Sequence, residues 1–217
     1  MKTRNLVLLA IILITGQACT IFSLNPLYNE EDLLEMPEVL GLWEDSDDGQ
    51  GKEFVSFERL GDDKFIFKYM EGDKQTVIDV YSGKEEADTI NENLKVLKEQ
   101  TISFEAGILE VGDHYFIDLY PYYAEGENDE EYYLWRNFIP THAFLKFEWE
   151  NEELVLYMFS YDRLQELFEQ NRIRIRHQQF DDYIVITAST DELQKFIRKY
   201  ADDEKAFEDP EKFVKIR

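Results

Sequence analysis

Only a few side chains in this sequence combine a reactive type with an informative position. Cys19 is the single cysteine of the 217-residue chain, and a thiol can be alkylated or oxidised. Three histidines, His114, His142 and His177, could bind zinc if the fold brought them together with an acid such as Asp118. They show no local ligand spacing such as HExxH or HxH. The sequence therefore predicts no metal site, and these histidines are the candidates if one exists.

Arginines recur at every second position in the run Arg172, Arg174, Arg176. In an extended strand, side chains with this spacing project from one face. If they face a cavity, their guanidinium groups could bind a carboxylate or phosphate ligand. If they face solvent, they pair with neighbouring acids. The outward orientation is favoured because Ile173 and Ile175 occupy the other face, and unpaired arginine is almost never buried. The arginines are speculative ligand-binding residues on the first alternative only.

The sequence contains no motif that assigns a reaction or a cofactor. It has no GxSxG nucleophile turn and no phosphate-binding glycine loop. Paired carboxylates for hydrolysis cannot be singled out from 47 acidic residues. We therefore expect a non-catalytic protein without a cofactor.

The first 18 residues have the layout of a secretory signal peptide. Lys2 and Arg4 precede an apolar run, Leu6 to Ile14, and small residues follow it. A membrane-spanning helix needs about 20 apolar residues, so this run is too short to cross a bilayer. Gly16 and Ala18 satisfy a small-residue cleavage rule that would make Cys19 the first residue of the mature chain.

The position of Cys19 resembles the lipobox of bacterial lipoproteins, although Gly16 stands where such boxes usually carry leucine. The resemblance implies a thioether-linked diacylglycerol on the thiol, a further acyl chain such as palmitate on the freed amine, and membrane attachment through these lipids. One alternative is a plain signal peptide with an incidental cysteine. Another is an uncleaved anchor that continues through Ile21 and Phe22. A bacterial cell-envelope location follows from lipidation, and Thr20, which is not the aspartate of inner-membrane retention signals, favours the outer membrane in a Gram-negative cell.

The chain is strongly acidic, with a formal net charge of −24. Such a surface repels nucleic acid, which we exclude as a partner, and it also repels anionic lipid headgroups. The hydrophobic content of 44% is sufficient for a substantial core.

Period-two alternation, typical of strands with one buried face, dominates the sequence after residue 40. We expect strands at 53–60, 64–70 and 76–83, and hairpins that turn at 112–113, 150–152 and 181–182. A short helix is expected within 25–37 and another at 162–171, whereas 84–100 could hold a helical turn and 121–137 is expected to be a loop. The domain organisation is then a signal peptide at 1–18, a lipid-anchored segment at 19–40 and a single β-rich domain at 41–217.

The clearest helix is expected near the C-terminus. Ser189 and Glu192 form a capping box, and Leu193, Phe196 and Tyr200 mark an apolar stripe. Residues 202–210 are expected to fray. The fold class is therefore mainly β, an antiparallel barrel or sandwich of about 8 to 10 strands with a C-terminal amphipathic helix.

Two resemblances add to this picture. Gly41 and Trp43 after a short helix resemble the entry of lipocalin-like barrels, in which a tryptophan on the first strand closes one end; Trp43 is therefore a speculative ligand-binding residue. The phrases SLNPLY after the cysteine and TASTDELQ near the C-terminus resemble a group of uncharacterised bacterial lipoproteins. This second resemblance implies lipid anchoring and no particular activity.

Our leading expectation is a binding module for a small apolar or amphiphilic ligand held inside the barrel, because aromatic residues make up 15% of the chain. The alternative is an envelope protein-interaction or scaffold module whose barrel is filled by its own side chains. A metal-dependent enzyme is the third. A pocket of about 300 Å³ or more beside Trp43 would favour the first, and a solid interior the second.

Overall fold

The computed structural model describes residues 21–46, 53–83, 97, 101–122, 139–150, 152–180 and 183–217. The signal sequence at 1–18, Cys19, most of the expected loop at 121–137 and nearly all of 84–100 lie outside these ranges. Within them, no helix has the length and apolar character needed to cross a membrane.

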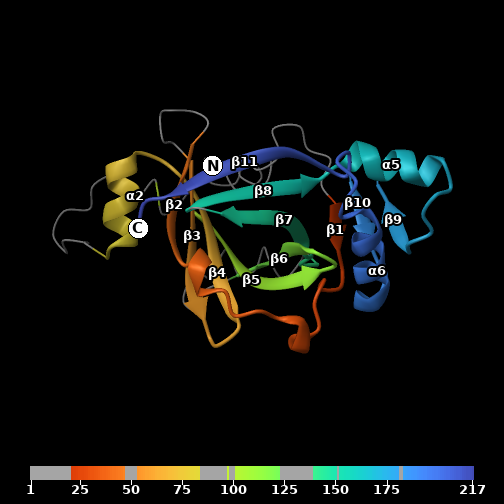
Figure 1. Ribbon diagram of the computed structural model, residues 1–217, viewed down its shortest axis with the longest axis horizontal. Helices are drawn as coiled ribbons and strands as arrows, with labels where there is room; N and C mark the ends of the chain where they lie inside the picture. Colours follow the sequence, from red (N-terminus) through yellow and green to blue (C-terminus); the bar gives the residue numbers. More distant parts are fainter. Residues whose placement is uncertain are drawn as a thin grey trace.

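Eight antiparallel strands form a closed barrel, which confirms the mainly β prediction (Figure 1). Their order around the barrel is β11-β2-β3-β4-β5-β6-β7-β8, so consecutive strands are neighbours except where β11 closes the ring. The strands are β2 (Gly41–Asp45), β3 (Glu53–Leu60), β4 (Lys64–Glu71), β5 (Ile102–Val111), β6 (His114–Pro121), β7 (Ala143–Glu150), β8 (Glu153–Phe159) and β11 (Phe207–Lys215).

Two of the expected hairpins belong to this barrel. Val111 pairs with His114 across the turn that contains Gly112, whose φ of 71° suits glycine. Glu150 pairs with Glu153 across the second turn, where Glu152 has a φ of 65°. Both predictions are confirmed, because turn residues and alternation are local signals that fix a hairpin register.

The strand expected at 76–83 is wrong, because α2 (Lys74–Tyr81) occupies this stretch. Asp73 caps the helix by accepting a hydrogen bond from the backbone N–H of Thr76 at 3.1 Å. Val77 is fully buried and packs with Leu97 against the side chains of Leu42 and Phe54. An apolar run this short is compatible with either period, and contacts with β2 and β3 favour the helix here.

The fraying expected after residue 201 is also wrong, because β11 follows the C-terminal helix. This strand pairs with β8 on one side and with β2 on the other. Phe207 and Phe213 bury their rings in two different core clusters. The last strand thus closes the barrel, and it does so by contacts with residues far away in the sequence.

The helices α5 (Tyr161–Glu169) and α6 (Thr190–Tyr200) begin and pack as their sequences predict. Ser160 caps α5 by accepting a hydrogen bond from Arg163 N–H. The expected capping box of α6 is present. Its whole apolar stripe is buried, namely Leu193, Phe196, Ile197 and Tyr200. The helix expected within 25–37 is reduced to short 3₁₀ turns, η1 (Glu30–Asp32) and η2 (Pro37–Val39).

A second, three-stranded sheet lies beside the barrel, at the end of the molecule opposite α2 (Figure 1). It consists of β1 (Ile21–Ser23), β10 (Ile184–Ile186) and β9 (His177–Gln179), in the order β1-β10-β9. The hairpin expected around 181–182 is confirmed by the antiparallel pairing of β9 with β10, although it is not part of the barrel. Strand β1 joins β10 in parallel.

The interior of the barrel is filled by its own side chains. Phe57, Phe65 and Phe147 are almost fully buried there, and rings of Phe57 and Phe67 contact each other at a centroid distance of 5.1 Å. A second cluster joins the three-stranded sheet, α5 and α6 to the outside of the barrel. The inward-pointing side chains thus form one contiguous buried cluster between the strands.

Closure of the barrel depends on Gly41. Its φ is 129°, and a Cβ atom added there would overlap the carbonyl oxygen of Arg217. That oxygen accepts a hydrogen bond from Leu42 N–H at 2.9 Å. We therefore expect Gly41→Ala to lower the free energy of unfolding by about 3 kcal/mol, measured by urea denaturation. Gly61→Ala is the matched control, because Gly61 has a φ of 73° and no atom within 4 Å of an added Cβ. The control should cost about 1 kcal/mol, and equal losses would contradict a role for the Arg217 contact.

Candidate functional site

The region most informative about function is where the N-terminal segment, residues 21–34, meets the barrel. Ser23 exchanges two backbone hydrogen bonds with His142, at 2.9 and 2.8 Å. Ser23 is fully buried. The segment that directly follows the predicted lipidation site is thus attached to the strand β7 side of the barrel and, through β1, to β10.

A buried acid–imidazole pair holds this segment in place. Asp118, on β6, is 1% exposed, and His142, immediately before β7, is 8% exposed. The Oδ1 atom of Asp118 lies 2.6 Å from Nδ1 of His142. We assign Nδ1 as the donor, because a carboxylate can only accept. Oδ2 accepts a hydrogen bond from the backbone N–H of Leu27 at 2.6 Å, so one carboxylate joins the barrel strand, the histidine and the N-terminal segment.

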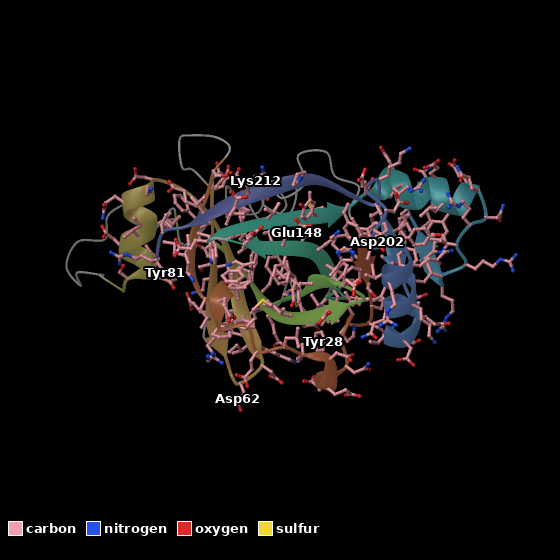
Figure 2. The ribbon with its side chains drawn as sticks, viewed as in Figure 1. Tyr28, Asp62, Tyr81, Glu148, Asp202 and Lys212 are labelled. Atoms are coloured by element: carbon pink, nitrogen blue, oxygen red, sulfur yellow. The ribbon has the colours of Figure 1, made fainter. Side chains whose placement is uncertain are left out.

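Tyr28 and Leu33 of the segment pack on β5 at Gly107, a position without a side chain. A Cβ atom added to Gly107 on β5 would come within 3.0 Å of the ring of Tyr28 and the side chain of Leu33. Tyr28 lies where the segment crosses the barrel (Figure 2), and the Nζ atom of Lys64 is 5.2 Å from its ring centre. Burial raises the pKa of the Tyr28 hydroxyl, so this ring stays neutral at physiological pH.

Helix α6 holds the segment from the other side. Gln194 donates hydrogen bonds from Nε2 to the carbonyl oxygen of Leu27 at 2.9 Å and to Oδ2 of Asp32 at 2.8 Å. Thr190 donates to the carbonyl oxygen of Pro26. The backbone N–H of Asn29 also donates to Asp32, and this bond is the main reason why the pKa of Asp32 is lowered. The segment is therefore an integral part of the folded body.

A shallow polar depression lies between this segment and the start of α6. Its volume is about 500 Å³ and it is open to solvent. It is lined by Asn25, Asn29, Arg176, Thr187, Ser189, Thr190 and Asp191. Glu192 already accepts a hydrogen bond from the backbone N–H of Ser189 and pairs with Arg176 at 2.6 Å. Arg176, the positive side chain of this lining, is thus paired with the protein's own carboxylate.

Trp43 lies inside the barrel core. Its side chain is 0% exposed, and its indole Nε1 donates a hydrogen bond to the carbonyl oxygen of Val39 at 2.8 Å. The Nζ atom of Lys215 lies 5.0 Å from the ring centre. These contacts place the tryptophan in the barrel interior beside η2 and β11, and it is not among the residues that line the polar depression.

The arginine run faces solvent, as the alternation with Ile173 and Ile175 predicts. Arg172, Arg174 and Arg176 are all exposed, whereas Ile173 is buried. Arg176 pairs with Glu192. The arginines therefore lie on the solvent-exposed stretch of chain that leads into β9. Of the three, only Arg176 borders the depression.

The three histidines have separate environments. His114 lies 2.7 Å from Asp202, a residue that follows α6 (Figure 2). His142 belongs to the buried pair with Asp118. His177 stacks on Phe168 at a centroid distance of 3.8 Å and contacts the carbonyl oxygen of Ile175. Among the described residues, no group of three His, Cys, Asp or Glu side chains could hold a metal ion.

One surface feature is absent from the sequence predictions. The rings of Phe22 and Tyr183 contact each other edge to face at 6.4 Å, and Phe180 stacks on Tyr183 at 4.6 Å. Phe180 is 47% exposed and Tyr183 is 41% exposed. In the sequence, Phe180 and Tyr183 on either side of the 181–182 turn could have indicated this aromatic surface. Phe22 could not have been assigned to it, because the pairing of β1 with β10 brings Phe22 to them.

Taken together, the described residues of this region form a structural attachment with an adjoining aromatic surface. The carboxylate of Asp118 accepts hydrogen bonds from the imidazole of His142 and from the backbone N–H of Leu27, and it thereby joins the barrel to the N-terminal segment. In comparisons with known proteins, no family model, no curated protein and no solved structure matches this chain.

Proposed function

We propose that this protein is a lipid-anchored component of the bacterial cell envelope and acts through its surface, as a non-catalytic protein-interaction or scaffold module. The observation that carries the choice of an interaction module over a ligand carrier is the packed barrel interior. Trp43 and the phenylalanines around it are buried against each other, and the depression described above lies outside the barrel.

Lipid anchoring rests on the position of Cys19 behind a signal-like sequence and agrees with the way the chain continues. Strand β1 begins at Ile21, two residues after the cysteine. Hydrogen bonds from Ser23, Leu27 and the α6 side chains tie this beginning to the rest of the protein.

Replacement of the cysteine tests the anchor directly. We expect Cys19→Ser to move the protein from the membrane pellet to the soluble envelope fraction almost completely, because two or three acyl chains supply the attachment at about 0.8 kcal/mol per buried methylene. The measurement is fractionation of the native cell with immunodetection, together with mass spectrometry of the N-terminal peptide. Thr20→Ser is the matched control and should remain in the pellet with its lipid.

Recovery of the wild-type protein with Met1 still attached, or with a free thiol at Cys19, would contradict the anchor. The interaction role has its own test on the same material. Organic extraction of the purified wild-type protein should release acyl chains only after base hydrolysis cleaves the ester bonds of the diacylglycerol. An apolar small molecule released in equimolar amount without such cleavage would instead favour a ligand carrier.

A further inference from the structure

The aromatic patch, defined as Phe22, Phe180 and Tyr183, lies on one face of the β1-β10-β9 sheet. Ile184 and Ile186 of β10 are fully buried on the other face, in the cluster shared with α5 and α6. Side chains alternate along a strand, so Tyr183 and Val185 point away from that cluster. Phe22 is paired with Val185 and shares its direction. One face of this sheet is therefore core and the other is an aromatic surface.

The arginine run adds charge to the same outer face. His177 is paired with Ile186, which points to the core, so Arg176 beside it points outward. Arg176 is neutralised by Glu192. Arg172 and Arg174 are exposed. The face therefore combines apolar rings with guanidinium groups, in a protein whose net charge is −24.

Chain length places this face close to the anchor. Only Thr20 stands between Cys19 and Ile21, the first residue of β1. A fully extended chain covers at most about 3.6 Å per residue, so this connection can span no more than roughly 7 Å. Phe22 follows immediately, and its ring contacts Tyr183. An acyl group on Cys19 thus brings the aromatic patch to the membrane surface.

We propose that the aromatic patch and the arginine run form a membrane-contact surface, which lies in the headgroup layer of the membrane that holds the lipid anchor. The inference rests on the proposed lipidation of Cys19. Phenylalanine and tyrosine rings partition into the boundary between headgroups and acyl chains, and exposed arginine donates hydrogen bonds to lipid phosphates. A second copy of this chain is a poorer occupant, because after cleavage of the signal sequence each copy carries a net charge of 21 − 47 = −26 and the two repel each other, whereas zwitterionic headgroups carry no net charge.

This contact fixes the orientation of the protein on the membrane. The outer face of the three-stranded sheet is directed to the bilayer, and α2, at the opposite end of the molecule, is directed away from it (Figure 1). The two attachments act together: the acyl chains hold the protein, and the surface restricts its rotation about the short connection. The far end of the barrel is then the part available to an envelope partner.

Depth-dependent fluorescence quenching tests the orientation on the full lipidated protein. Cys19 is blocked by lipid, so the Phe180→Cys variant carries one free thiol for an environment-sensitive dye. The matched control is Trp149→Cys, since Trp149 is 40% exposed and lies on β7, seven residues beyond the Ser23–His142 bridge. That spacing corresponds to roughly 23 Å along the strand. Both proteins are reconstituted in vesicles of the zwitterionic lipids phosphatidylethanolamine and phosphatidylcholine, with a quencher near the headgroups.

The expected result is severalfold stronger quenching at position 180 than at position 149, with a blue-shifted emission at position 180 only. Equal quenching at the two positions, with an acyl group confirmed on Cys19 by mass spectrometry, contradicts the membrane-contact surface but not the lipid anchor. Absence of the acyl group overturns both. A photoreactive probe on the same Phe180→Cys thiol, used in native membranes, gives an independent answer. Cross-links to lipid support the proposal, whereas cross-links mainly to a second copy or to another protein overturn it.

Discussion

The Asp118→Ala variant is expected to lose roughly 3–5 kcal/mol of unfolding free energy and to release the N-terminal segment from the barrel. The carboxylate accepts hydrogen bonds from Leu27 N–H and from the imidazole of His142, both at 2.6 Å. Its removal leaves these two donors buried without an acceptor, and the free energy of unfolding falls by the cost of their desolvation. Urea denaturation measures the loss, and hydrogen exchange of the backbone from residue 23 to 29 measures the release.

Controls separate this effect from a general weakness of the barrel. Glu110→Ala removes an exposed acid on β5, next to β6, and should change stability by no more than about 0.5 kcal/mol. Asp118→Asn keeps the size of the side chain but offers an NH₂ group to one of two donors, so it should fall between wild type and Asp118→Ala. An Asp118→Ala protein with wild-type stability and unchanged hydrogen exchange at Leu27 would show that Asp118 does not hold the N-terminal segment on the barrel.

The Trp43→Ala variant is expected to lose a similar amount, roughly 3–5 kcal/mol, for a different reason. The indole is fully buried in the barrel core and its Nε1 atom donates to Val39. Truncation removes this hydrogen bond and leaves a cavity among phenylalanine side chains that are already in close contact. Thermal or urea unfolding followed by circular dichroism measures the loss.

This substitution also discriminates between a packed barrel and a ligand carrier. In a packed barrel the wild type does not bind an apolar fluorescent probe with saturation, whereas the Trp43→Ala protein gains such binding. Trp149→Ala is the matched control, because the same side chain is removed from an exposed position; its cost should be below about 1 kcal/mol. Saturable binding by the wild type that Trp43→Ala abolishes would favour the ligand carrier over the interaction module.

The elements that could be predicted from the sequence are those defined by residues close together in the chain. The hairpin at Gly112 follows from alternation on both sides of a turn residue. Helix α6 follows from Ser189, Glu192 and an apolar stripe, all within two or three turns. These signals are short-range, and the mainly β class, a barrel or a sandwich, follows from the number of such hairpins, whereas closure into a barrel depends on β11.

The sequence misassigned two elements because their conformation depends on distant partners. The stretch of α2 has apolar residues compatible with a strand, and its packing against β2 and β3 decides for a helix. Strand β11 carries little alternation of its own, and Pro210 interrupts it. It becomes a strand because β8 and β2 both present unsatisfied backbone groups to it, as in Lys215 opposite Trp43.

For function, the sequence by itself determined the candidates: an export-like N-terminus with Cys19, a lone set of histidines and an arginine run whose spacing placed it on one face. Tertiary structure alone decided how they are used. It joined Leu27 to Asp118 across 91 positions, separated the three histidines, filled the barrel around Trp43, and brought Phe22 to Tyr183. The physical reason is that composition and spacing fix which face a side chain occupies, whereas contacts between distant segments fix what that face meets.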